Sequence, residues 1–79
     1  MPHVVVKLYP GRSREQKARL AERIAADIIE TLGSDERSIS VAIEDVRPED
    51  WLEQVYKPDI AARWEQLFKK PGYDPTDQG

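Results

Sequence analysis

The sequence predicts an α/β fold of the α+β type, in which two parallel strands are joined by one long helix and followed by short C-terminal helices. Three observations predict it. Residues 3–9 form an apolar, β-branched run, residues 13–33 form a capped amphipathic segment, and residues 38–46 alternate between apolar and polar side chains. Two strands linked through a helix of about twenty residues make a parallel βαβ unit, because a parallel pair needs a long crossover connection.

The first strand is predicted over residues 3–9 and ends at the turn pair Pro10-Gly11. A strand with apolar side chains on both faces is expected to have little solvent exposure on either one. On one face lie Val4, Val6 and Leu8, and on the other lie Val5 and Tyr9.

The long helix has start and stop signals in the sequence. Ser13 can cap its first turn, Gln16 stands three residues on to complete a capping box, and Gly33 is placed to end it. A buried face is expected along residues at four-residue spacing, broadened by small side chains. The spaced residues are Leu20, Ile24, Ile28 and Leu32, and the broadening ones are Ala21, Ala25 and Thr31.

The second strand is predicted over residues 38–46, with Ile39, Val41 and Ile43 on one face. Pro48 then suits the first turn of a short helix that carries Trp51, and Pro58 is expected to open another. Because the long helix covers only one face of the two-stranded sheet, the other face is expected to meet the C-terminal helices or another subunit.

The length of 79 residues predicts one small domain over residues 1–73, with a mobile tail at residues 74–79. The chain has no cysteine with which to form disulfides, so association is the expected source of further stability. Symmetric C2 dimers are the commonest assemblies, and we expect a homodimer whose strands together complete the sheet.

Composition excludes several function classes. The net charge of −3 argues against a nucleic-acid partner. No apolar stretch approaches the roughly 20 residues that span a bilayer, and the N-terminus lacks the pattern of a signal peptide, so a cytoplasmic protein with no membrane partner is expected. One histidine and no glycine-rich phosphate loop predict that the chemistry uses no cofactor and no metal ion.

Pro2 is the residue that points to a function. Aminopeptidases usually remove an initiator methionine that precedes a small residue such as proline, so the mature chain is expected to begin with the secondary amine of Pro2. An α-amino group titrates near pH 8, by a reference value of about 7.7–8.0. Apolar surroundings or a nearby cation would keep such an amine neutral, and a neutral amine can act as a general base.

Gly11-Arg12-Ser13 and Glu15-Gln16-Lys17 stand at the start of the helix, behind a strand that follows Pro2 directly. This arrangement resembles the tautomerase superfamily, the family of 4-oxalocrotonate tautomerase. A closer similarity, over nearly the whole chain, is to the PptA-type tautomerases, which are dimeric. It rests on Met1-Pro2-His3, Ser38-Ile39-Ser40, Pro48-Glu49-x-Trp51 and Lys69-Lys70-Pro71-Gly72-Tyr73.

The resemblance implies an isomerase that converts enol and keto forms of 2-hydroxydienoates or arylenolpyruvates. Pro2 would move the proton, Arg12 would hold a substrate carboxylate, and Trp51 would form an apolar wall of the site. On the residues alone, an exposed arginine beside a helix start is the favoured interpretation of Arg12, and a core or interface residue is the favoured interpretation of Trp51.

Ser40 is where the chain departs from the hexameric relatives, which carry a second arginine at this point of the strand. A serine binds substrate through a hydroxyl without adding charge, so a monocarboxylate with an aromatic or short apolar tail fits better than a dicarboxylate. On the residues alone, Ser40 is an ordinary outward polar position. His3 lies on the opposite side of the strand from Pro2, because side chains alternate, and is expected to be structural.

Three alternatives remain open from the sequence. Related enzymes use the same proline for dehalogenation or hydration of unsaturated acids. Hexameric assembly is the alternative to a dimer. If Met1 is retained, the nitrogen of Pro2 is a tertiary amide with no useful basicity, and the chain would be a non-catalytic, oligomerising βαβ module.

Overall fold

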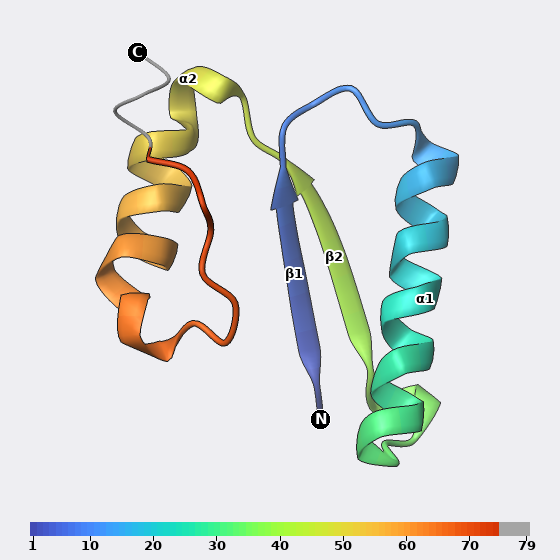
Figure 1. Ribbon diagram of the computed structural model, residues 1–79. Coiled ribbons are helices and arrows are strands. Elements are labelled where there is room, and N and C mark those ends of the chain that lie inside the picture. Colours follow the sequence, from blue (N-terminus) through green and yellow to red (C-terminus); the bar gives the residue numbers. More distant parts are fainter. Residues whose placement is uncertain (75–79) are drawn as a thin grey trace. The chain divides into compact units, whose positions relative to one another are not determined.

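The computed structural model describes residues 1–74 and forms two compact units, Met1–Val46 and Arg47–Gly79 (Figure 1). The first unit contains both strands and the long helix. The prediction of one domain over residues 1–73 stays a prediction, and the predicted mobile tail lies, beyond Asp74, outside the described residues. Over residues 1–74, no helix has the length and apolar character needed to cross a membrane.

The sheet of the first unit consists of β1, His3–Leu8, and β2, Ser40–Asp45, which run parallel as predicted. The register pairs His3 with Ser40 and Leu8 with Asp45 at its two ends. One further backbone hydrogen bond extends the pairing at each end, from the Ser40 N–H to the Pro2 carbonyl at 3.2 Å and from the Val46 N–H to the Leu8 carbonyl at 2.8 Å.

The helix α1, Arg14–Leu32, begins and ends at the predicted residues. The Gln16 N–H donates to the Ser13 hydroxyl at 3.1 Å, and the Ser13 N–H donates to the Gln16 side chain at 2.9 Å, which completes the capping box. Gly33 ends the helix with φ 69°, a left-handed conformation that disfavours side chains with a Cβ.

Helix α1 lies along one face of the sheet, as Figure 1 shows. Nothing in the first unit covers the other face, where Val5 is 42% exposed. The prediction that β1 has little exposure on either face is therefore wrong for this unit, because one helix can cover only one face of a two-stranded sheet.

The helix is longer than the sheet that it covers. Nineteen helical residues span roughly 28 Å at 1.5 Å each, whereas a six-residue strand spans roughly 20 Å. Ile24 and Ile28 are half-buried as predicted, but Leu32, at the overhanging end, is 67% exposed. Leu20 is also exposed, by 39%, and lies at the edge of a groove described below.

The second strand begins later than predicted. Glu36–Ser38 form a single 3₁₀ turn, η1, and only Ser40 starts the strand. The Asp35 carboxylate accepts a hydrogen bond from the Arg37 N–H at 3.0 Å, and the Ser38 hydroxyl donates to the Asp35 carbonyl at 2.7 Å. These local bonds hold the backbone in a turn, which is why Ser38 does not extend the strand.

The second unit begins with one continuous helical stretch in three parts: α2, Pro48–Trp51, then η2, Leu52–Ile60, which is a π-helix, then η3, Ala61–Gln66, which is 3₁₀. Pro48 lies in the first turn as predicted. The prediction that Pro58 opens a new helix is wrong, because Pro58 lies inside η2. The wider π turn moves the carbonyl that a proline ring would strike in an α-helix.

Candidate active site

Pro2 directly precedes the first residue of β1, His3. Its carbonyl is held by the Ser40 N–H of the neighbouring strand, and Met1 is fully exposed. While Met1 is attached, the nitrogen of Pro2 is an amide, so basicity at this position requires removal of Met1. The exposure of Met1 leaves that bond accessible to an aminopeptidase.

Ser40 is brought to Pro2 by the strand register, and its side chain contacts His3. The Ser40 hydroxyl lies 2.6 Å from His3 Nδ1, on the face of the sheet that α1 leaves uncovered. The sequence places His3 away from Pro2 but does not reveal its contact with Ser40. Only the register of the parallel strands pairs His3 with Ser40, and the sequence of neither strand determines that register by itself.

Arg12 lies at the opposite end of β1, in the loop that leads into α1 (Figure 1). Its guanidinium forms no ion pair or hydrogen bond within residues 1–74. Because β1 alone spans roughly 20 Å, Pro2 and Arg12 of the same chain cannot contact one small substrate. The structure therefore does not bring these two predicted site residues together within one chain.

A groove of about 170 Å³ runs beside Arg12 between the end of β1 and the first turns of α1. Its lining combines two leucines, an amide and two cations, which suits an anion that carries an apolar tail. The lining residues are Leu8, Arg12, Gln16, Lys17 and Leu20.

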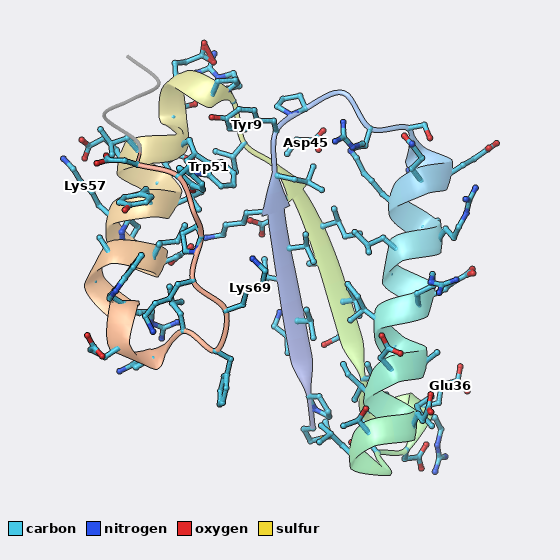
Figure 2. All side chains as sticks on the ribbon, viewed as in Figure 1. Tyr9, Glu36, Asp45, Trp51, Lys57 and Lys69 are labelled. Atoms are coloured by element: carbon cyan, nitrogen blue, oxygen red, sulfur yellow. The ribbon has the colours of Figure 1, made fainter. Side chains whose placement is uncertain are left out.

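Lys17 is the charged residue of this groove that the functional prediction missed. Its ammonium lies 2.9 Å from the Asp45 carboxylate at the end of β2, and its side chain is only 26% exposed. Asp45 can be followed in Figure 2 at that end of the strand. The ion pair fixes an ammonium in the same groove as the exposed guanidinium of Arg12. The Glu15-Gln16-Lys17 segment was the signal in the sequence, but a local motif does not reveal a partner on a distant strand.

Trp51 belongs to α2 in the second unit (Figure 2). Its indole Nε1 donates a hydrogen bond to the Tyr73 hydroxyl at 2.9 Å. The Tyr73 ring in turn contacts Tyr56, with ring centroids 5.8 Å apart and planes tilted by 55°. Trp51 is thus part of an aromatic cluster, and no pattern in the sequence indicates that Tyr73 is its partner.

Arg47 stands at the start of α2 and is bound by local carboxylates. Its Nε donates to Asp50 at 3.0 Å and lies 3.6 Å from Glu49. The hydrogen bond to Asp50, with the attraction of both carboxylates, raises the pKa of Arg47. The group therefore stays charged, but two carboxylates offset its charge and it does not line the groove of Arg12, which makes it a weaker candidate for binding an anionic substrate.

The family model described as "Tautomerase enzyme" matches residues 2–56, which is more than half of the chain and begins at Pro2. The chain belongs to the tautomerase family. The resemblance predicted from the sequence is thereby confirmed, and membership supports tautomerase activity in general terms.

Curated relatives agree with this assignment. A "Probable tautomerase" of Xylella fastidiosa is 51% identical over 73 residues, which cover 92% of this chain and 89% of the relative. "Tautomerase PptA" of Enterobacter sp. strain 638 is 45% identical over 74 residues, covering 92% of this chain and 97% of the relative.

Solved structures agree on the fold. TomN, described as a 4-oxalocrotonate tautomerase homologue in the tomaymycin biosynthetic pathway, superposes with a TM-score of 0.61 at 34% identity. The superposition covers 81% of this chain and 95% of TomN. The predicted fold class, built on a βαβ unit with two parallel strands, is confirmed.

Proposed function

We propose that this protein is an enol–keto tautomerase whose general base is the amino-terminal amine of Pro2, exposed by removal of Met1. Its substrates are 2-hydroxydienoate or arylenolpyruvate monocarboxylates, and it acts in the cytoplasm. The observation that carries the proposal is the family match, which begins at Pro2 and runs through both strands and α1.

In the proposed reaction the neutral amine of Pro2 removes the proton from the enol hydroxyl and delivers it to a carbon of the conjugated system. The reaction moves one proton within the substrate, so the amine is regenerated in each cycle. Proline suits this role because its ring fixes the direction of the nitrogen, and positioned bases of this kind contribute about 10²–10⁴-fold to rate.

Arg12 is proposed to bind the substrate carboxylate through its guanidinium fork. In each site, Arg12 and Pro2 would come from different copies of the chain. The length of β1 supports this arrangement. The small core supports association as well, since only Val46 and Val55 are buried among residues 1–74. A homodimer is our proposal, with a hexamer as the alternative.

Ser40 and Trp51 complete the proposed site. Ser40 donates its N–H to the Pro2 carbonyl, and its hydroxyl, which contacts His3, brings no second positive charge to the site. One charged carboxylate is thus favoured over two. Trp51 provides an apolar wall, which matches an aryl tail and disfavours the protonated form of a nearby amine.

The test is an intact-mass measurement and an arylenolpyruvate ketonisation assay on the same preparation. We expect a mass lower by one methionine, together with a rate above that of buffer. Pro2→Ala should lower kcat by about 10²-fold or more, as expected for loss of a general base. Arg12→Ala should raise KM, whereas Arg19→Ala, which removes a similar exposed charge from α1, should change neither constant.

Two results would refute the proposal. One is a processed protein with no rate above buffer for any aryl or short-chain enol acid. The other is an unchanged rate in both Pro2→Ala and Arg12→Ala. Retention of Met1 in the native host would instead favour the non-catalytic module.

A further inference from the structure

We propose that Tyr73 is a positioning residue for Trp51, and that this pair sets the preference of the enzyme for substrates with an aryl tail. The proposal rests on the tautomerase function proposed above. It concerns a residue beyond the part of the chain that the family model matches, which ends at residue 56.

The first step of the argument is the hydrogen bond. An indole has a single polar hydrogen, and in Trp51 that hydrogen is bonded to the Tyr73 hydroxyl at 2.9 Å. The bond selects one orientation of the indole ring about its side-chain torsions. Without it, a half-buried N–H would lose its partner, and ring orientations that return it to water would become competitive.

The second step is what holds Tyr73. This residue follows the helical stretch, in a segment with no regular secondary structure that runs back alongside it in Figure 1. Contact with the ring of Tyr56, on η2, orients the ring of Tyr73. Because α2 and η2 are one continuous helical stretch, Trp51 and Tyr56 are held on the same support, and Tyr73 bridges them.

The third step connects ring orientation to specificity. An aryl group and an aromatic wall attract each other most in offset-stacked or edge-to-face arrangements, so the gain depends on the tilt of the wall. A flexible aliphatic tail gains from apolar contact whatever the tilt, since apolar burial is not directional. Loss of the Tyr73 hydroxyl should therefore penalise aryl substrates more than aliphatic ones.

The experiment measures kcat/KM for phenylenolpyruvate and for a short aliphatic enol acid in four variants: Tyr73→Phe, Trp51→Phe, the double variant, and Tyr56→Phe. We expect Tyr73→Phe to lower the aryl value about fivefold, the worth of a typical hydrogen bond, and the aliphatic value less than twofold. Tyr56→Phe removes a hydroxyl from the same cluster while keeping the ring, and should leave the ratio of the two values unchanged.

The double variant separates positioning from a general structural effect. Once Trp51→Phe has removed the indole, no N–H remains to orient, so removing the Tyr73 hydroxyl as well should have no further effect on the aryl-to-aliphatic ratio. Independent, multiplicative effects of the two substitutions would overturn the proposal. An equal loss for both substrates in Tyr73→Phe would also overturn it.

A binding measurement distinguishes failure of this inference from failure of the proposed function. In a Trp64→Phe background Trp51 is the remaining tryptophan, and its fluorescence should change on adding phenylpyruvate, with a weaker apparent affinity in Tyr73→Phe. An active enzyme with the same aryl preference and affinity in Tyr73→Phe overturns only the inference. An inactive wild-type protein whose Trp51 fluorescence ignores phenylpyruvate overturns both.

Discussion

At the scale of single residues, the groove beside Arg12 contains a second cation, the ammonium of Lys17. Lys17 is anchored by Asp45 across the gap between α1 and β2, so its ammonium is held in place before any substrate arrives. Lysine side chains in water are usually disordered and lose entropy on binding. Anchoring reduces that loss, which is why a modest ion pair can matter more for binding than for stability.

We therefore predict that Lys17→Met raises KM for an arylenolpyruvate about three- to tenfold, a loss of about 1 kcal/mol, which is the net worth of a typical hydrogen bond. The value of kcat should stay within about twofold, because Lys17 does not move the proton. Steady-state kinetics measure both constants.

Two controls show whether Lys17→Met acts on substrate binding and not on folding or overall charge. The free energy of unfolding of Lys17→Met should differ from that of wild type by less than about 1 kcal/mol, the usual contribution of a solvent-accessible ion pair. Arg23→Met, another exposed cation of α1, should leave KM unchanged. A fall in kcat with an unchanged KM would contradict the role proposed for Lys17.

At the scale of elements, local signals in the sequence determined what could be predicted. Ser13, Gln16 and Gly33 fix the two ends of α1 through hydrogen bonds to near neighbours, and the structure has them as expected. Where two local rules compete, the sequence alone does not decide between them. Ser38 fits the alternating strand pattern, yet its hydrogen bond to the Asp35 carbonyl holds it in a 3₁₀ turn.

Pro58 illustrates the same limit. Proline is a reliable signal for the start of an α-helix, but that rule assumes the α-helical spacing of carbonyl groups. In the π-helix η2 the hydrogen bond from the Ala61 N–H is shared between Tyr56 and Lys57, so the backbone there has the wider turn that tolerates a proline. The helix changes direction only later, where Arg63 has φ −118° and ψ 22°.

The capping box of α1 supports a prediction about stability. Ser13→Ala removes the side-chain acceptor of the Gln16 N–H and should lower the free energy of unfolding by about 1 kcal/mol, within a range of about 0.5–2 kcal/mol for such caps. Urea denaturation followed by circular dichroism measures the change. The protein concentration must be the same in every sample, because association contributes to apparent stability.

Ser34→Ala is the matched control for the capping variant, since Ser34 follows the end of α1 and lies outside the capping box. Its effect should stay within about 0.5 kcal/mol. Equal destabilisation in the two variants would contradict the stabilising role assigned to the capping box.

At the scale of the whole molecule, the candidate site is where prediction from one sequence ends. Pro2, Arg12 and Ser40 could each be chosen from motifs, because each stands at a recognisable point of a strand or helix start. The distances between them could not be chosen in this way, and in the structure the length of β1 separates Pro2 from Arg12 within one chain. The Trp51–Tyr73 contact could not be predicted from the sequence either, because its two residues are 22 positions apart and Tyr73 lies in an irregular segment.

Sharing of the site between subunits has a quantitative consequence. If the Pro2 of one chain works with the Arg12 of another, Pro2→Ala and Arg12→Ala chains can complement each other in mixed oligomers. In a random equimolar mixture, half of the chains supply Pro2 and half of their partners supply Arg12. About one quarter of the sites should then be intact, whether the assembly is a symmetric dimer or a larger ring.

We therefore predict that co-refolding Pro2→Ala with Arg12→Ala in equal amounts gives about a quarter of the sites the wild-type KM, by the symmetry argument for shared sites. At substrate concentrations far below the raised KM of Arg12→Ala, the rate per chain should then be about a quarter of the wild-type rate. The same mixture made without refolding should show no sites with the wild-type KM until subunits exchange. Co-refolding Pro2→Ala with the double variant Pro2→Ala/Arg12→Ala should restore nothing, because no chain then supplies the base. If the first mixture shows no sites with the wild-type KM while native mass spectrometry shows that mixed oligomers have formed, then Pro2 and Arg12 do not act together across a subunit boundary.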